Sequence, residues 1–462
     1  MSAYVVARAT LAVRLGVVSV AFIYVALLHA IYVGHISPAF AYLGYVLTPA
    51  PVGMLVLAFV AAWLPSLWLP VRLLQPSTLV YWLLYVLAYV PSTFMPGLTL
   101  DREPVDLLML LATLVGSFAL LGLILRVPRV PFSRPRLDAR VYWAAVFVLT
   151  GTLLAVVVMA FGFPQSIPSL ADVYDVRADY READAGRLQR FAVSWLGNVL
   201  LPIFIAVGLL RRAPAWIVVG VAGQLFLYAA TGFKSILFSS ALVLCIFVAL
   251  SLRGRLFGLA VAFGAMVLAV GTWAIDQMLL QPLLSSWFVR RLILTPGILT
   301  GWYFDYFHGA PKAQLAHSVL SPFLDYPYPA TPPILIGDAY FGQAATYANA
   351  NLWADAFANF GFVGMISFTL LLGAFLWTYD GLASGDDFPR RAFATILLGG
   401  PAISLANSAL LTSMLTHGVA LAWLAVFFMP RATLQERSRR PHAPPPPGDP
   451  REPRDRALRQ QP

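Results

Sequence analysis

The sequence is poor in the residues from which metal centres and disulfide frameworks are built. Of its 462 residues one is a cysteine, Cys245, and only 11% are charged. A single cysteine forms no disulfide within the chain and matches no zinc-ligand spacing. The only adjacent aspartates, Asp386 and Asp387, fall on the side that we expect to be cytoplasmic. The sequence therefore disfavours metal-assisted chemistry, and we expect neither a metal nor another cofactor.

Motifs for nucleotides and nucleic acids are also missing. The chain has no Gly-rich phosphate loop and no Gly-x-Ser-x-Gly turn around a nucleophile, which disfavours nucleotide-sugar donors. No internal repeat is visible, which weakens the case for a transporter built from inverted repeats. The net charge of +10 is carried mostly by short loops and the C-terminal tail. It therefore sets membrane topology, and we expect no nucleic-acid partner.

What the sequence has in abundance is apolar length. Hydrophobic residues make up 60% of the chain, and the mean hydropathy is +0.76. Because about 20 apolar residues cross a bilayer, these values predict an all-α polytopic membrane protein with about 12 transmembrane helices within residues 1–430. The first span is too long for a signal-peptide core and should remain as an anchor. We place the spans near residues 9–32, 49–70, 76–97, 104–126, 141–163, 192–210, 213–231, 235–252, 256–279, 357–378, 391–409 and 412–429.

Arginine marks every loop that this order places on the cytoplasmic side when the N-terminus, with Arg8 and Arg14, is cytoplasmic. This is the distribution that the positive-inside rule requires. We therefore expect a multi-pass protein of the cytoplasmic (inner) membrane with both termini cytoplasmic. The basic, proline-rich tail, residues 431–462, has almost nothing apolar to bury and should be disordered. The cytoplasmic loops in which arginine occurs lie at residue 72 and at residues 126–140, 211–212, 253–255 and 390–391.

Two loops on the outer side are enlarged, at about residues 164–191 and 280–356. The first contains Arg177, and the second contains the adjacent Arg290 and Arg291. Outward arginines break the positive-inside trend, so each needs an acidic partner or a role. The first loop is rich in acidic neighbours, which could simply neutralise its arginines. The Arg290–Arg291 pair has no acidic residue nearby in sequence and is the stronger candidate for a functional role.

The second loop leads into a helix whose start is polar. Asn351, Asp355 and Asn359 recur every four residues and therefore share one face of that helix. Asn349 or Asn351 could be its N-cap and nothing more. A carboxylate at a membrane boundary is costly without a role. We therefore favour Asp355 as a general base that activates an attacking hydroxyl.

Two histidines and a lysine are further candidates. His308 and His317 could each act as a base, although a single histidine is more often a hydrogen-bonded interfacial side chain. Lys234 lies at the outer end of a turn between two spans, where it could reach a phosphate or extend to lipid headgroups. The many aromatic residues of the second loop, Tyr303 and Tyr328 among them, could stack on sugar rings, but aromatics also belong to any membrane interface.

Four stretches in and beside the outer loops carry a family resemblance. They are YFDYF at 303–307, DYPYPATPPILIGDAYFG at 325–342, ANANLWADAFANFGFVG at 348–364 and, in the first outer loop, VYDVRADY at 173–180. These motifs resemble the bacterial oligosaccharide repeat unit polymerases, the O-antigen and exopolysaccharide polymerases, which are related to the O-antigen ligases. The resemblance covers about a third of the chain, and its specific part is the block 303–364. Two enlarged outer loops and about 12 spans also fit this family.

The resemblance implies a GT-C-like membrane glycosyltransferase with an outward-facing active site. Such an enzyme moves a growing glycan from undecaprenyl diphosphate to the non-reducing sugar of a new lipid-linked repeat unit. Arginine suits the diphosphate leaving group, because its planar fork binds two phosphate oxygens at once. The implied partners are the undecaprenyl-diphosphate-linked glycan, membrane lipid and a polysaccharide chain-length regulator. The implied general base is Asp355, His308 or His317, and the implied substrate-binding residues are Arg177, Arg290, Arg291, Lys234, Asn349, Asn351, Tyr303, Asp305 and Tyr328.

Three other functions stay open at this point. An O-antigen ligase shares the architecture, and sequence does not separate it from a polymerase. A lipid-linked oligosaccharide flippase or another transporter would need a polar path across the membrane, whereas the charges here cluster at one face. A scaffold subunit of an export assembly would need no outward arginines.

Overall fold

The computed structural model describes residues 3–430 except 131, 133–134, 136, 170–185, 252–253, 255, 343–345 and 385–387. Within these ranges the chain forms helices and no strands. Ten of the described helices are long and apolar enough to cross a membrane. The expected polytopic helical membrane protein is thereby confirmed. The tail, Arg177 and the 173–180 motif lie outside the described residues.

The ten spanning helices agree with ten of the predicted spans. Three of them run through a π-helical turn, so that two α-helical pieces make one rod. They are α1 (Ala3–Ile31) with α2 (Ser37–Phe40), α4 (Pro76–Leu84) with α5 (Val90–Thr99), α6 (Pro104–Ile124), α7 (Ala139–Phe161), α9 (Arg187–Trp195) with α10 (Leu201–Arg211), α11 (Pro214–Thr231), α12 (Lys234–Ser251), α13 (Phe257–Leu279), α16 (Leu352–Ala383), and α19 (Leu410–Leu415) with α20 (Val419–Phe428).

Two predicted spans do not form single long helices. The span expected at 49–70 is the shorter α3 (Val52–Trp63), which begins after Pro51 and tightens into a 3-10 turn at Pro65. Proline lacks the N–H that a helix interior requires, which explains both limits. The span expected at 391–409 is divided at Leu398 into α17 (Phe388–Leu397) and α18 (Gly399–Asn407).

The largest difference from expectation lies between residues 286 and 308. The sequence predicts an outer loop here, but the segment is a continuous helix made of η6 (Ser286–Leu294, π-helical) and α14 (Thr295–His308). It packs against α5 on one side and α16 on the other. Two glycines allow the close approach: a Cβ on Gly297 would lie 2.4 Å from the carbonyl oxygen of Pro91, and Gly301 faces Pro96. We call this element the 286–308 helix.

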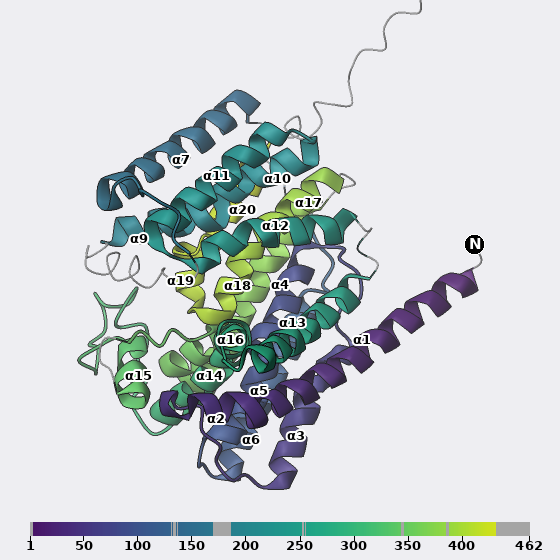
Figure 1. Cartoon of the computed structure of the whole chain (residues 1–462), viewed down its shortest axis with the longest axis vertical. Helices are drawn as coiled ribbons and strands as arrows, with labels where there is room; N and C mark the ends of the chain where they lie inside the picture. Colours follow the sequence, from purple (N-terminus) through teal and green to yellow (C-terminus); the bar gives the residue numbers. More distant parts are fainter. Residues whose placement is uncertain are drawn as a thin grey trace, which may run out of the picture.

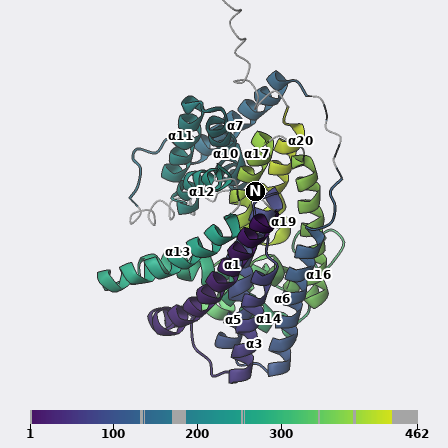
Figure 2. The same cartoon turned by 90° about the vertical axis from the view of Figure 1, so that its right-hand side faces the viewer.

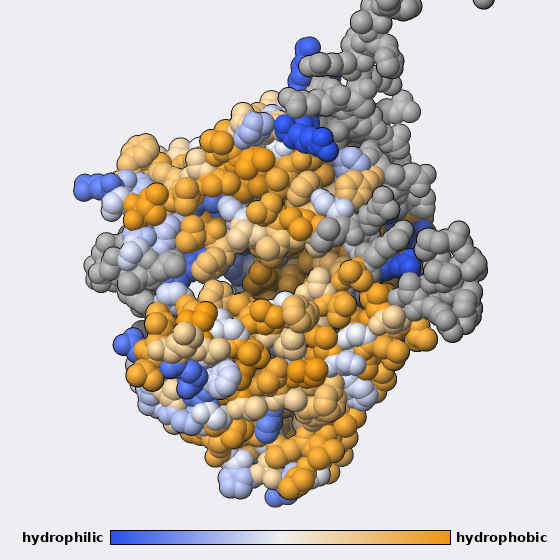
Figure 3. All heavy atoms as spheres, turned by 45° about the vertical axis from the view of Figure 1, so that its right-hand side comes forward, coloured by the Kyte–Doolittle hydropathy of each residue, from blue (hydrophilic) through white to orange (hydrophobic). Residues whose placement is uncertain are grey.

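The helices form two groups (Figure 1). One group contains α7, α10, α11, α12, α17 and α20, and the other contains α1, α3, α5, α6 and the 286–308 helix. The paired helices α1 and α13 lean away from the rest when the molecule is turned (Figure 2). The surface is mostly hydrophobic, and it is hollowed between the two groups, with hydrophobic residues around much of the hollow (Figure 3). A short helix, α15 (Pro332–Phe341), lies outside the bundle beside the 286–308 helix.

Candidate functional site

The beginning of the 286–308 helix carries a buried cation. Arg290 is 7% exposed, and its guanidinium group lies over the rings of Phe40, at 4.5 Å, and Tyr45, at 5.6 Å. Its Nη2 atom donates a hydrogen bond to the hydroxyl of Ser286 at 2.8 Å. Among the described residues no carboxylate pairs with Arg290. The described contacts of its guanidinium group are therefore aromatic faces and neutral polar groups, which stabilise a buried cation without cancelling its charge.

A second cation approaches the same end of the helix from α12. The ammonium of Lys234, the first residue of α12, lies 3.6 Å from the centre of the Trp287 ring. Phe238, one turn further along α12, packs on Phe288 at 5.8 Å between ring centres. Lys234 thus contacts the same helical turn that carries Arg290. Arg291 follows Arg290 directly in sequence and is exposed.

A histidine and an aspartate meet just before this turn. His35, which follows α1, has its Nε2 atom 2.9 Å from the Ser285 hydroxyl and 3.8 Å from the Asp276 carboxylate. The Gln277 side chain lies 3.2 Å from His35 Nδ1. Asp276, 1% exposed, also accepts the backbone N–H groups of Leu284 and Ser285. The carboxylate therefore fixes both the start of the helix and the imidazole.

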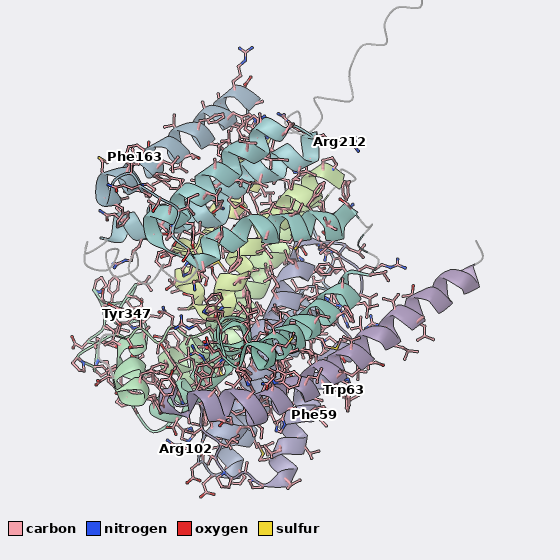
Figure 4. All side chains as sticks on the ribbon, in the orientation of Figure 1. Phe59, Trp63, Arg102, Phe163, Arg212 and Tyr347 are labelled. Carbon is pink, nitrogen blue, oxygen red and sulfur yellow. The ribbon has the colours of Figure 1, made fainter. Side chains whose placement is uncertain are left out.

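The other end of the helix holds charges that are fully paired. Asp305 forms an ion pair with Arg102, which also donates to the Asp305 carbonyl at 2.9 Å. The second carboxylate oxygen of Asp305 accepts the Tyr340 hydroxyl from α15, and the Tyr340 ring stacks on Trp302 at 5.0 Å. One turn away, His308 lies 3.4 Å from Asp106. Arg102 is labelled in Figure 4 at this end of the molecule.

The polar residue just before α16, Asn351, uses its side chain for hydrogen bonds within the protein. Asn351 is its N-cap: the side-chain oxygen accepts the N–H groups of Trp353 and Ala354, at 3.0 and 3.1 Å. The Asn351 amide nitrogen donates to Thr300 on the 286–308 helix at 2.8 Å. The N-cap interpretation of Asn351 is therefore confirmed, and the residue is buried. Asn349, close by in sequence, is exposed.

Asp355 follows one turn later and is almost enclosed. It is 8% exposed, and one carboxylate oxygen accepts the side-chain amide of Asn359 at 3.2 Å. This contact confirms that Asp355 and Asn359 share a face of α16. The backbone then breaks, because Phe360 and Gly361 depart from helical angles and Gly361 has a φ of +64°. The first eight residues of α16 are thus a short helix of their own.

The turn segment 312–320 covers this break. The N–H groups of Ala313 and Gln314 donate to the carbonyls of Ala358 and Asn359, at 2.9 and 3.1 Å, which the broken helix leaves without partners. Leu315 N–H donates to the Asn359 side chain at 2.8 Å. Lys312 lies over the Phe357 ring at 4.3 Å, and burial lowers its pKa. The structure therefore adds a cation at the broken start of α16.

Of the remaining predicted site residues, three have structural contacts. Tyr303 is buried and donates to the Ala348 carbonyl at 2.9 Å. Tyr328 donates to the Pro311 carbonyl. His317 packs on Tyr326 at 5.3 Å, and burial lowers its pKa. Its Nδ1 atom is buried without a hydrogen-bond partner among the described residues.

These residues form two groups along one helix. Arg290 and Thr300 are ten residues apart, which is about 15 Å of helix. Asn351 reaches Thr300, and Asp355 lies a further turn along α16. Arg290 and Asp355 are thus too far apart to act on the same atom of a substrate. His35 reaches the same end of the helix as Arg290 instead, since it contacts Ser285 and Arg290 contacts Ser286.

Sequence reasoning missed the His35–Asp276 pair for a clear reason. His35 and Ser285 are 250 residues apart, and nothing in either local pattern connects them. The signal that could have drawn attention was Asp276 itself, a single acid near the end of an otherwise apolar span. Arg102, the partner of Asp305, was missed in the same way.

Comparison with known proteins adds no identification: no family model, no curated protein and no solved structure matches this chain.

Proposed function

We propose that this protein is a membrane glycosyltransferase that polymerises lipid-linked oligosaccharide repeat units. The observation that carries the proposal is the buried Arg290, whose charge no described carboxylate neutralises. A buried cation of this kind is expensive unless an anion binds it for part of the working cycle. The motif resemblance supplies the anion, which is the diphosphate of undecaprenyl diphosphate.

The cations at the beginning of the 286–308 helix bind the diphosphate in this proposal. Lys234 and Arg290 contact its oxygens, and the exposed Arg291 joins them from the same turn. The hydrophobic hollow between the helix groups offers the carrier chain an apolar environment (Figure 3). During transfer, the bond from the sugar C1 atom to the diphosphate oxygen breaks while C1 bonds to an acceptor hydroxyl. The cations stabilise the charge that develops on the leaving diphosphate.

The attacking hydroxyl needs a proton acceptor close to the diphosphate. The sequence favours Asp355 for this role. Asp355, however, lies beyond Thr300, which is itself about 15 Å from Arg290 along the 286–308 helix. His35 lies beside the cations, and Asp276 holds it through its Nε2 side. In the proposed mechanism His35 Nδ1 exchanges its Gln277 contact for the hydroxyl and accepts the proton. Asp355 then belongs to the framework that positions the broken helix.

The arrangement supports the expected orientation. Tyr347, from the predicted second outer loop, and Phe163, which precedes the first, lie on the side of the molecule away from Arg212 (Figure 4). Arg212 belongs to a loop that the positive-inside rule places in the cytoplasm. We propose that the diphosphate site faces outward in the cytoplasmic membrane and that both termini are cytoplasmic.

Chain growth is the deciding measurement. Membranes containing the protein are supplied with the lipid-linked repeat unit of the source organism, and the products are separated by length. We expect a ladder of polymers from the parent protein, and a loss of about 10²–10⁴-fold in rate for His35→Gln. Asp355→Asn should retain more activity than His35→Gln at matched protein levels. The reverse order would return the role of base to Asp355.

The same assay separates the alternatives. Transfer of one unit to a lipid acceptor without chain growth would identify a ligase. Movement of the lipid-linked unit across vesicles without a new glycosidic bond would identify a flippase. Either product would overturn the polymerase proposal.

Orientation has a separate test. In a Cys245→Ala background, a cysteine at the exposed Val319 should react with an impermeant thiol reagent in intact cells, and one at the exposed Arg140 should not. Ala313 is unsuitable as a reporter because it is buried. Reaction at residue 140 alone would show that the real orientation is the reverse of the proposed one.

A further inference from the structure

A cavity at the opposite end of the bundle is lined by four arginines. It measures about 300 Å³ and lies between α1, the connection 68–75, α4 and the end of α6. Arg126 follows α6 and Arg102 precedes it, so the 21 residues of α6, about 30 Å, separate this cavity from the Arg102–Asp305 pair. All the charged residues that line the cavity are arginines: Arg14, Arg72, Arg126 and Arg129.

Three of these guanidinium groups have no acidic partner among the described residues. Arg14 donates to the Leu67 carbonyl at 2.6 Å, Arg72 to the Thr10 hydroxyl at 3.1 Å, and Arg126 to the Trp68 carbonyl at 3.1 Å. Each bond goes to a neutral oxygen, and it fixes the side chain while most of its five N–H groups remain for a ligand.

Only the fourth arginine is neutralised within the described residues. Arg129 pairs with Asp380 at 3.3 Å, and Asp380 also accepts the Ser77 backbone N–H at 2.9 Å. The cavity also contains Gln75, whose side-chain oxygen is buried without a hydrogen-bond partner in the described part of the chain. A hydroxyl on a ligand would satisfy that oxygen. The net positive charge of the cavity and the unused N–H groups of its arginines both favour an anionic ligand.

We infer that this cavity binds a phosphate-bearing anion, and its surroundings favour the phosphate headgroup of an anionic lipid. Guanidinium forks match phosphate oxygens, and basic residues next to the membrane attract anionic headgroups. Large apolar side chains are exposed on the same segments, where acyl chains would lie. They are Leu11 and Leu15 on α1, Leu67 and Leu74 in and near the connection, and Leu123 and Val127 at the end of α6.

Lipid binding to the purified full-length protein tests the inference. Phosphatidylglycerol and phosphatidylcholine are titrated separately, and bound lipid is counted by native mass spectrometry. We expect phosphatidylglycerol to bind about tenfold more tightly, and Arg72→Gln/Arg126→Gln to weaken its binding by about tenfold or more. The matched control is Arg140→Gln/Arg212→Gln, which removes two exposed arginines outside the cavity and should change binding less than about twofold.

Inorganic diphosphate distinguishes a free anion from a lipid. If diphosphate raises the melting temperature of the parent protein but not of the cavity variant, and the two lipids bind equally, the ligand is a soluble phosphate compound. Equal lipid binding with no diphosphate effect would overturn the site, as would equal losses in the cavity and control variants. Should the cavity variant misfold, protection of Arg72 and Arg126 from phenylglyoxal by phosphatidylglycerol in the parent protein gives the same decision.

Discussion

The two ends of the 286–308 helix treat positive charge in opposite ways. At its end, Arg102 is paired with Asp305, which also accepts the Tyr340 hydroxyl. At its beginning, Arg290 is more deeply buried, and its contacts within the described residues are with the rings of Phe40 and Tyr45 and with Ser286, none of which is acidic. The paired end has what a structural cation needs, and the unpaired end lacks it. This difference is the reason why we propose that an anionic substrate binds at the unpaired end.

The largest expected effect is at the unpaired end. Arg290→Ala should lower the rate of chain growth by about 10²–10³-fold, because the departing diphosphate loses a donor placed for it. Arg290→Lys should recover only part of this rate, since lysine keeps the charge without the planar fork. Rates are measured in membranes with matched protein levels. A lysine variant as active as the parent protein would contradict the proposal that the guanidinium fork of Arg290 binds the diphosphate.

A smaller loss is expected at the residue that holds His35. Asp276→Asn keeps the size of the side chain but removes the negative charge beside the imidazole. Chain growth should slow by about tenfold or more, less than for His35→Gln. Because Asp276 also accepts two backbone N–H groups, the melting temperature must be measured alongside the rate. A variant that loses stability but keeps its rate would limit Asp276 to a structural role.

At the paired end we expect a stability effect and little change in rate. Arg102→Ala should destabilise the protein by about 1 kcal/mol, because it leaves a partly buried carboxylate without its partner. A cycle with Asp305→Asn should show coupling between the two residues. Unfolding in detergent and chain growth are measured on the same preparations. A rate loss as large as that of Arg290→Ala would contradict the distinction between the two ends.

The smallest effect is expected at His308. Its contact with Asp106 is 3.4 Å long and partly exposed, with side-chain exposures of 26% and 20%. His308→Gln should therefore change stability by less than about 0.5 kcal/mol and leave chain growth unchanged. An inactive His308 variant with normal stability would indicate that the active site lies at the paired end of the helix.

Hydropathy predicted most of the fold because long apolar runs have few alternatives to crossing a membrane as helices. It failed for the 286–308 helix, where Arg290, Arg291, Asp305 and His308 lower the mean hydropathy although most of the helix is buried in protein. Helices that face protein on all sides need no apolar surface for lipid. Composition alone does not separate such a helix from a loop.

The candidate site was predicted less completely than the fold. Residues close in sequence were found, as the Asn351–Asp355–Asn359 face and the Asn351 cap show. Contacts between distant segments, such as His35 with Asp276, depend on how α1 and α13 pack, and no local pattern encodes that. Arg290 was singled out by the absence of acidic neighbours in sequence, and among the described residues it also lacks an acidic partner in space.

The break in α16 has a consequence for the order in which segments of the protein fold in the membrane. The eight residues before Phe360 are too few to span a bilayer, and they contain Asp355 and Asn359. The carbonyls of Ala358 and Asn359, the last two of these residues, accept N–H groups of Ala313 and Gln314. Lipid offers no substitute for those hydrogen bonds. We therefore expect the longer part of α16 to enter the membrane as an ordinary span, and its first eight residues to reach their final place only when residues 312–320 fold over them.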